Sequence, residues 1–391
     1  MTDSGFPVVG IVGGGQLARM CQPPAVALSV GLAVLATSEA ESAALVIPDA
    51  LVGRHDDVDA VRRLAERSDV VTFDHEHVPA DVLAELASDG VALHPTPEAL
   101  RYAQDKLAMR RRLGELGFPC PRWTLARRRD EVQAFGEEVG WPVIAKTPRG
   151  GYDGKGVRRV EGKGDVDDWL AVVGGPGPLA DGVLLEEAVA FTREVAALVA
   201  RRPNGEARAW PLVETVQEDG ICTEVLAPAP GIDEDTAATA TDLALAIAEA
   251  LGVTGVLAVE LFEVAGHDGP GFLVNELAMR PHNSGHWTID GAVTSQFEQH
   301  LRAVLDLPLG ATDARARWTV MANVLGGASD TMYPELVSVL REDPDLKVHL
   351  YGKEVRPGRK LGHVTACGDD LADLRRRARR AADHLRGASE R

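Results

Sequence analysis

Two glutamates lie inside stretches of the sequence that otherwise have the apolar pattern of buried strands. Glu260 stands within Leu257–Phe262, and Glu276 stands within Leu273–Leu277 beside Asn275. A carboxylate in an apolar strand is costly unless it is paired or bound to a cation. Carboxylate and amide oxygens suit Mg²⁺ that is shared with a polyphosphate. The two stretches therefore predict a magnesium site at Glu260 and Glu276, with structural ion pairs as the alternative.

A glycine-rich segment, Lys146–Gly156, lies between two predicted strands. Its backbone amides can wrap phosphate oxygens, and Lys146, Arg149 and Lys155 supply positive charge. The Gly-Lys-Ser/Thr ending of a Walker loop is missing from the segment, which disfavours a P-loop NTPase. The segment predicts a loop that closes over phosphate groups, and a solvated hairpin tip is the alternative.

Two further segments concentrate groups that bind anions. Within Arg280–Trp287, Arg280 can form a bidentate pair with a planar oxyanion, and His282 can exchange a proton near neutral pH. Lys353–Lys360 places four cations within eight residues, which is typical of a site for a phosphate monoester. A zinc site at His282 and His286 fits the spacing but lacks a third nearby ligand. The basic run also fits a solvated surface.

A second glycine segment, Gly13–Gly15, follows the apolar stretch Val8–Val12 and precedes a helical pattern. Backbone amides at such a junction can approach a phosphate at the start of a helix. The segment also fits a loose dinucleotide fingerprint, with Glu39 or Glu41 as the ribose partner. A tight turn between a strand and a helix explains these glycines equally well.

The elements that must position these residues fall into an N-terminal series and a later series. The N-terminal series alternates strands and helices, which predicts βαβ units on a parallel sheet. Its expected elements are strands at Val8–Val12, Leu32–Ala36, Val70–Phe73 and Val91–Leu93, and helices at Val58–Arg67 and Ala80–Ser88. The later series includes helices at Asp105–Leu116 and Asp235–Leu251, a hairpin formed by Pro142–Lys146 and Val157–Val160, and strands at Val256–Phe262 and Phe272–Glu276.

Composition limits the class of protein. The chain has 391 residues, and 41 Lys+Arg against 59 Asp+Glu give a net charge of −18, which disfavours general nucleic-acid binding. The length predicts two to three domains. Four widely separated cysteines are expected to be reduced packing residues. The sequence lacks a signal-peptide pattern and a long apolar stretch, so we expect a cytoplasmic protein that does not enter a membrane.

Together, the glycine loop, the two carboxylate strands, the segment Asn275–Trp287 and the run Tyr351–His363 resemble the N5-carboxyaminoimidazole ribonucleotide synthetases, ATP-grasp enzymes of purine biosynthesis. The resemblance extends from Gly10–Met20 to about His363. It implies an α/β and α+β fold with an N-terminal doubly wound, Rossmann-like preATP-grasp domain, a small lid, and a C-terminal ATP-grasp domain with a small terminal subdomain. The implied divisions are residues 1–104, 105–189 and 190–391.

The resemblance also implies which residues bind ATP. Lys106 and Lys146 are expected at the phosphates, with Gly151–Val157 as the lid above them. The residues expected around ATP are Lys106, Lys146, Gly151, Tyr152, Asp153, Gly154, Lys155, Gly156, Val157, Glu186, Glu187, Ala188, Val189, Glu194, Gln217, Asn275 and Glu276. Two Mg²⁺ ions are expected, held by Glu260 and Glu276.

The implied reaction joins bicarbonate to the amine of 5-aminoimidazole ribonucleotide while ATP becomes ADP and phosphate. The implied catalytic residues are Arg280 and His282, which would hold bicarbonate and its activated form, and Tyr152 and Asp153, which would face the amine. The remaining acceptor residues would be Gly14, Gly15, Gln16, Lys353, Arg359 and Lys360. Small molecules are the expected partners, and a homodimer is expected because the family usually forms one.

The sequence departs from the family pattern at three positions. Lys106 stands where many relatives have arginine, Gln217 occupies a position that can be histidine, and Met279 stands where proline is frequent.

Three other functions are alternatives to this one. They are another ATP-grasp ligase, such as a formate-using purine transformylase or a biotin carboxylase, a nicotinamide-dependent oxidoreductase, and a non-catalytic nucleotide sensor. The basic runs Arg110–Arg112, Arg127–Arg129 and Arg375–Arg380 have no assigned ligand and are expected to be solvated helix or loop faces.

Overall fold

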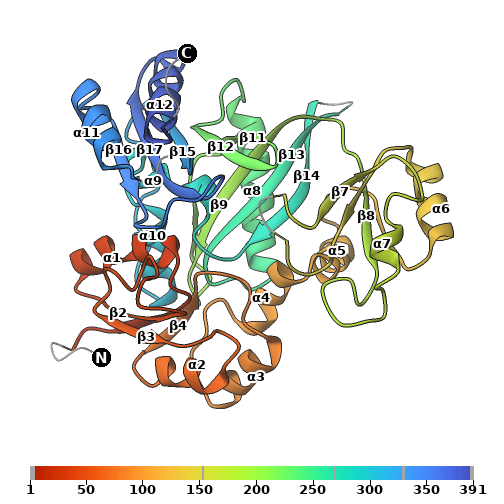
Figure 1. Ribbon diagram of the computed structural model, residues 1–391, viewed down its shortest axis with the longest axis horizontal. Helices are drawn as coiled ribbons and strands as arrows, with labels where there is room; N and C mark the ends of the chain where they lie inside the picture. Colours follow the sequence, from red (N-terminus) through yellow and green to blue (C-terminus); the bar gives the residue numbers. More distant parts are fainter. Residues whose placement is uncertain (1–4, 152–153, 267–268, 328–330, 388–391) are drawn as a thin grey trace.

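The strands of the protein form three sheets in the part of the chain that the structure describes. The structure is a computed structural model, and it describes residues 5–151, 154–266, 269–327 and 331–387. In Figure 1 the large sheet lies above the N-terminal part, and the middle part of the chain lies to its right. In these residues no helix is long and apolar enough to cross a membrane.

The N-terminal part contains a parallel sheet with the strand order β3-β2-β1-β4. Its elements are β1 (Val8–Val12), α1 (Gln16–Leu28), β2 (Gly31–Ala36), β3 (Asp49–Val52), α2 (Val58–Ala65), β4 (Val70–Phe73), α3 (Ala80–Ser88) and α4 (Pro97–Gln104). The predicted parallel sheet is confirmed. The predicted strand at Val91–Leu93 is wrong, because Leu93 forms only an isolated bridge with Val71.

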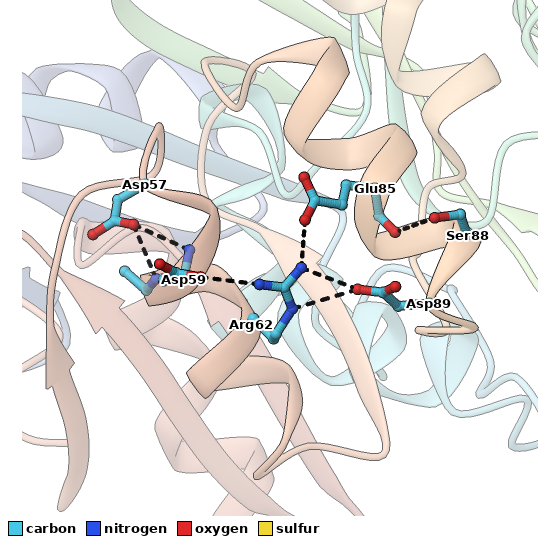
Figure 2. A network of polar contacts seen from close by, with 7 residues as sticks. Asp57, Asp59, Arg62, Glu85, Ser88 and Asp89 are labelled. Carbon is cyan, nitrogen blue, oxygen red and sulfur yellow. Dashed lines mark hydrogen bonds and ion pairs between the residues drawn. The ribbon is translucent and has the colours of Figure 1, made fainter.

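The two helices α2 and α3 are connected by polar contacts at their exposed side (Figure 2). Arg62 donates hydrogen bonds to Asp59 (3.0 Å), Asp89 (3.2 Å) and Glu85. Asp57 caps α2 by accepting a hydrogen bond from the backbone of Asp59 at 3.0 Å. Exposed pairs of this kind contribute at most about 1 kcal/mol each, so the buried apolar side chains of both helices hold them on the sheet.

The middle part contains an antiparallel sheet with the order β5-β8-β6-β7. Its elements are α5 (Lys106–Glu115), β5 (Trp123–Ala126), α6 (Arg129–Val139), β6 (Val143–Lys146), β7 (Val157–Val160), α7 (Asp167–Leu170) and β8 (Val183–Glu187). The strands β6 and β7 form the predicted hairpin around the glycine-rich segment. Asp105 ends α4 and caps α5 by accepting a hydrogen bond from the backbone of Ala108 at 2.9 Å.

The C-terminal part contains a sheet of nine strands in which β14-β13-β9-β11-β12-β15-β17-β16 are consecutive neighbours and β10 pairs with β9. Its strands are β9 (Phe191–Arg201), β10 (Ala207–Ala209), β11 (Val213–Glu218), β12 (Ile221–Ala227), β13 (Gly255–Gly266), β14 (Gly269–Ala278), β15 (Trp318–Leu325), β16 (Lys347–Leu350) and β17 (Lys360–Gly368). Its helices are α8 (Glu234–Ala250), a 3₁₀ turn η1 (Asn283–Gly285), α9 (Thr288–Gly291), α10 (Gln296–Val304), α11 (Tyr333–Glu342) and α12 (Leu371–Leu385).

The hydrophobic cores connect the N-terminal part to the large sheet. One buried cluster joins Val12 and Phe73 of the parallel sheet to Val259 of β13 and Ile247 of α8. Polar contacts also join the two parts. Thr72 of β4 forms a hydrogen bond with His300 of α10 at 2.9 Å, and His300 accepts a hydrogen bond from the backbone of Val256 in β13 at 3.1 Å. The end of β4 is therefore held close to the strands that carry the predicted carboxylates.

Candidate active site

The predicted carboxylates lie together on one face of the large sheet. Glu260 of β13 is directly paired with Glu276 of β14, and Glu260 pairs on its other side with Ala196 of β9. Glu194 is two residues from Ala196 on the same strand, so it points to the same face. Three carboxylates from neighbouring strands thus form a concentrated negative region.

A β-bulge brings Asn275 into the same region. The pairing shifts after Glu260, so that Glu276 and Val274 face consecutive residues of β13 and Asn275 is the additional residue. The Nζ atom of Lys146 donates to Oδ1 of Asn275 at 3.1 Å, and Nζ of Lys106 lies 2.8 Å from Oε1 of Glu276. The bulge therefore lets two consecutive side chains, Asn275 and Glu276, reach two lysines of the candidate site.

A buried ion-pair network supports Lys146. Its Nζ atom lies 2.8 Å from Oε2 of Glu186, and Nε of Arg110 lies 2.7 Å from Oε1 of the same carboxylate. Arg110 also donates to the backbone oxygens of Val274 at 2.9 Å and Asn275 at 2.7 Å. The prediction that Arg110 is solvated is therefore wrong, since its side chain is 0% exposed.

The glycine-rich segment leaves the end of β6 and returns at the start of β7. The backbone N–H of Thr147 donates to the oxygen of Gly156 at 2.9 Å and so closes the base of the loop. Gly151 and Gly156 have φ angles of +81° and +74°, and an added Cβ on Gly156 would lie 2.6 Å from Oγ1 of Thr147. These positions require glycine for both conformation and space. Tyr152 and Asp153, which were predicted to face the acceptor amine, lie outside the described residues.

The other residues predicted around the nucleotide occupy the edges of this region. Lys155 and Val157 are exposed on the loop, and a Cβ on Gly154 would contact the Cα of Gly220 at 3.6 Å. Glu187 is turned outward and accepts a hydrogen bond from Nε of Arg122 at 2.7 Å. Ala188 and Val189 follow β8, while Glu194 and Gln217 lie on β9 and β11. The structure thus brings the loop, β8 and the large sheet around one region.

Arg280 and His282 follow β14 and reach toward different partners. Nε of Arg280 lies 2.7 Å from Oε1 of Glu76, which belongs to the N-terminal part. Nε2 of His282 lies 3.5 Å from Oε1 of Glu260, and its Nδ1 lies 2.9 Å from Oγ of Ser284. Burial and the charges of Arg280 and Lys360 lower the pKa of His282 to about 3, so the imidazole is neutral near pH 7.

The zinc alternative for His282 and His286 is not supported. His286 is turned toward Gln296, whose Nε2 lies 2.9 Å from Nδ1 of the imidazole. In the described ranges, no group of three or more His, Cys, Asp or Glu side chains is arranged to hold a metal ion. The pair Glu260 and Glu276 does suit magnesium, which often takes one or two protein carboxylates and completes its shell with substrate phosphates and water.

The charges around Glu260 and Glu276 also favour a bound cation. Burial and the charges of Glu276 and Glu194 raise the pKa of Glu260 to about 7. Burial also favours the protonated form of Glu276, but the positive charges of Lys106, Lys146 and Arg110 outweigh it and lower the pKa of Glu276. Glu260 thus meets repulsion that a bound cation would relieve.

One contact joins predicted acceptor residues from opposite ends of the sequence. Gln16, at the start of α1, accepts a hydrogen bond from Lys353, and the backbone N–H of Gly15 donates to Asp74. Arg359 donates to the backbone oxygen of Glu354 at 3.2 Å, and Lys360 begins β17. Gly14 adjoins Gly15 in the same turn. The structure therefore brings the N-terminal glycine turn close to the C-terminal basic run.

Three residues of this region were not predicted from the sequence: Asp74, Glu76 and the buried Arg110. Asp74 and Glu76 directly follow β4, and polar side chains at the carboxyl ends of parallel strands are a known signal for a binding site. That signal was available in the sequence. Burial of Arg110 had no comparable signal, because it occurs in a run of three arginines that reads as a solvated helix face.

Comparisons with known proteins agree with this arrangement. Residues 7–104 match the ribonucleotide synthetase preATP-grasp domain, residues 111–297 match the ATP-grasp domain, and residues 319–377 match the phosphoribosylaminoimidazole carboxylase C-terminal domain. The predicted ATP-grasp fold is therefore confirmed.

Several similar proteins share the name N5-carboxyaminoimidazole ribonucleotide synthase or synthetase. The N5-carboxyaminoimidazole ribonucleotide synthase of Mycobacterium tuberculosis is 53% identical over 384 residues, which cover 97% of this chain and 88% of the relative. The N5-carboxyaminoimidazole ribonucleotide synthetase structure from Thermus thermophilus has a TM-score of 0.84 and 38% identity, covering 98% of this chain and 99% of that chain. The Aspergillus clavatus synthase in complex with ADP and 5-aminoimidazole ribonucleotide has a TM-score of 0.85 and 32% identity, covering 97% and 98%. The chain therefore belongs to the N5-carboxyaminoimidazole ribonucleotide synthase family of ATP-grasp ligases.

Proposed function

We propose that this protein carboxylates the exocyclic amine of 5-aminoimidazole ribonucleotide, using ATP and bicarbonate, to form N5-carboxyaminoimidazole ribonucleotide in de novo purine biosynthesis. The observation that carries the proposal is the joint placement of Lys106, Lys146, Glu260 and Glu276, with Arg280 near enough for its charge to act on both carboxylates. This set combines groups for a nucleotide phosphate and its cation with a guanidinium for a small oxyanion. Family membership favours this reaction over formate transfer, biotin carboxylation or hydride transfer.

Phosphoryl transfer from ATP to bicarbonate needs positive charge around the transferred group. Lys106 and Lys146 would supply it, and their contacts with Glu276 and Asn275 hold both ammonium groups near the two carboxylates. Mg²⁺, held by Glu260 and Glu276, would neutralise phosphate charge when bound. We propose two such ions. Arg280 would orient bicarbonate, and Glu76 fixes the guanidinium in position.

Carboxyphosphate, the activated form of bicarbonate, hydrolyses readily in water, so exclusion of solvent matters for this reaction. The Gly151–Val157 loop would cover the nucleotide phosphates and the reacting groups. The pKa of His282 is about 3, so its imidazole is neutral and is not a strong base. His282 would therefore hold bicarbonate and its activated form. Tyr152 and Asp153 would face the acceptor amine.

The acceptor would lie between the N-terminal turn and the basic run. Lys353, Arg359 and Lys360 would bind the ribonucleotide phosphate, and the turn at Gly14–Gln16 would contact the remainder of the molecule. The contact between Lys353 and Gln16 supports this placement. Glu186–Val189 would line the adenine of ATP, and Glu194 and Gln217 would lie around the nucleoside. We also propose a cytoplasmic homodimer with divisions at residues 1–104, 105–189 and 190–391.

The test is ADP formation by the purified protein with each substrate omitted in turn. We expect ADP formation with Mg-ATP, bicarbonate and 5-aminoimidazole ribonucleotide, and a large decrease when any one is missing. Formate and biotin should not replace bicarbonate or the ribonucleotide. Turnover that requires formate or biotin, and ignores the aminoimidazole ribonucleotide, would exclude the proposed function. Light scattering of the same preparation tests the homodimer.

A further inference from the structure

A cavity lined in part by α4 and α5 has no role in the proposed reaction. Its volume is about 380 Å³, within the usual range for small-ligand sites. It is lined by Arg101, Tyr102, Asp105, Leu107, Ala108, Arg111, Arg112, Glu115, Arg127, Arg149 and Asp181. The proposed function assigns none of these residues to ATP, magnesium, bicarbonate or the acceptor. Arg149, whose charge was expected at the phosphates, is paired instead with Asp105 and Asp181.

The cavity is rich in arginine although the chain as a whole carries a net charge of −18. Five arginines line it against three carboxylates. Two of the arginines are paired within the cavity wall. Arg149 contacts Asp105 at 3.0 Å and Asp181 at 2.6 Å, and Arg112 lies 3.4 Å from Glu115. These contacts use all three carboxylates of the lining.

The other three arginines have no such partner. Throughout the described residues, the guanidinium groups of Arg101, Arg111 and Arg127 form no ion pair or hydrogen bond. All three side chains are exposed and come from separate positions in the chain, two on consecutive helices and one after β5. Their convergence on one cavity brings together like charges that repel each other unless an anion is present.

The chemistry of the lining indicates the ligand. Guanidinium groups bind phosphate through paired hydrogen bonds, and three of them suit more than one phosphate group. Tyr102, Leu107 and Ala108 add an aromatic and apolar wall that a bare phosphate would not use. We propose that this cavity is a second ligand site, which binds a small molecule with at least two phosphate groups, of the nucleoside diphosphate or triphosphate class.

Direct binding tests this proposal without depending on the reaction. Isothermal titration calorimetry with ADP as the probe should give two molecules bound per wild-type chain, one at the catalytic site and one at the cavity. The triple variant Arg101→Ala/Arg111→Ala/Arg127→Ala should lose the second binding event, with a decrease in its affinity of at least about tenfold. The first binding event and turnover should be unchanged, because these residues lie outside the catalytic machinery.

A matched control removes the same charge elsewhere. Arg54, Arg159 and Arg376 are exposed arginines that pair locally with Asp56, Glu161 and Asp373. The variant Arg54→Ala/Arg159→Ala/Arg376→Ala should keep both binding events. A single ADP bound per wild-type chain, or equal loss of the second event in both triple variants, would overturn the proposal.

A second probe identifies the part of the ligand that is recognised. Inorganic pyrophosphate has the two phosphate groups of ADP but cannot use the aromatic and apolar wall. We expect weaker binding of pyrophosphate than of ADP at the cavity, with the same sensitivity to the triple variant. Equal or tighter binding of pyrophosphate would retain the anion site but overturn its assignment to the nucleotide class. Failure of turnover with both binding events intact would instead count against the proposed function alone.

Discussion

Arg110 and Arg111 are neighbours in the sequence, but their surroundings on α5 are very different. Arg110 is fully buried and contacts Glu186, Val274 and Asn275. Arg111 is exposed at the rim of the arginine-rich cavity. The functions of the two side chains therefore differ. Arg110 stabilises the strands that carry the candidate site, and Arg111 is available to a ligand.

Replacement of Arg110 should destabilise the protein. In the Arg110→Ala variant, Glu186 loses one of its two cationic partners while it stays buried, and two backbone oxygens lose a donor. Breaking a buried pair costs about 3–5 kcal/mol, so we expect a decrease of that order in the free energy of unfolding in urea. The neighbouring Arg111→Ala variant should change it by less than about 0.5 kcal/mol. Equal effects would contradict the structural role of Arg110.

Glu276 has a separate role in the proposed chemistry. The Glu276→Ala variant removes a predicted magnesium ligand and the partner of Lys106. We expect kcat to fall by at least about 10²-fold, the effect typical of removing one electrostatic group from a catalytic site. The far-ultraviolet circular dichroism should be unchanged. Glu249→Ala, at the exposed end of α8, is the control and should keep wild-type turnover. An active, magnesium-dependent Glu276→Ala enzyme would refute the assignment.

Asp74 should make stability depend on pH. Burial raises the pKa of Asp74 from 3.8 to about 6 in the folded chain, although Arg280 and Gly15 oppose the shift. The folded state thus holds this proton more tightly than the unfolded state. The resulting stabilisation is present below pH 3.8 and is lost as the pH rises through about 6. The loss is about 3 kcal/mol.

The Asp74→Asn variant lacks this titration. Its free energy of unfolding, measured in urea, should therefore increase relative to the wild type by up to about 3 kcal/mol as the pH rises from about 4 to about 7. The exposed Asp81→Asn variant should follow the wild-type curve. Parallel pH curves for the wild type and Asp74→Asn would show that Asp74 titrates normally in the folded protein.

At the scale of elements, two local irregularities shape the candidate site. The bulge of β14 places Asn275 and Glu276 toward the lysines, and the glycine loop between β6 and β7 folds back on itself at Thr147. A regular strand and an ordinary hairpin would give neither arrangement, because side chains of consecutive residues in a regular strand point to opposite faces.

Closure of the glycine loop should limit the loss of the activated intermediate. In Gly156→Ala, the new Cβ would lie 2.6 Å from Thr147 and would require a φ angle of +74°, at a cost of about 1 kcal/mol or more. We expect a looser lid, lower kcat, and more ADP than carboxylated product, because water reaches carboxyphosphate. Gly162→Ala, which has no atom within 4 Å of the added Cβ, is the control. Unchanged coupling in Gly156→Ala would exclude this role for the loop.

At the scale of the whole molecule, the candidate site depends on contacts between parts that are distant in sequence. Arg280 follows the large sheet, while its partner Glu76 follows β4 of the N-terminal sheet. Lys353 and Gln16 make a second contact of this kind. The shared hydrophobic core holds the two sheets in place, so the acceptor residues and the predicted bicarbonate residue keep their relative positions.

Loss of Glu76 should affect one substrate more than the others. In Glu76→Ala, Arg280 keeps its charge but loses the carboxylate that orients its guanidinium. A charge-assisted hydrogen bond contributes about 1.5–3 kcal/mol, so kcat/KM for bicarbonate should fall about tenfold or more. KM for ATP should change by less than about twofold, since Glu76 does not contact the lysines. His77→Ala, at an exposed neighbouring position, is the control. An equal effect on both substrates would indicate a general structural defect instead.

Much of the fold was predictable because its signals are local. Apolar runs and helical periodicity predicted β1, β4, α3 and the β6–β7 hairpin, and the alternation of elements predicted the parallel sheet. The predictions missed β3 and α4, which are short. The helix α1 also continues through Pro23 and Pro24, although proline is unfavourable inside a helix. Short elements have weak periodicity, and their stability comes from the neighbours on which they pack.

The sequence by itself determined which chemical groups the protein has and the elements that carry them. Two carboxylates in apolar strands required a compensating charge, and a run of glycines required a loop. Only the tertiary structure decided the partners: Lys106 for Glu276, Glu186 for Arg110, and Glu76 for Arg280. Those partners are far apart along the chain. The packing of the sheets brings them within hydrogen-bond distance, and a local sequence pattern cannot do so. The same packing buries Arg110 and leaves Arg111 at the surface, although the sequence presents them as equivalent.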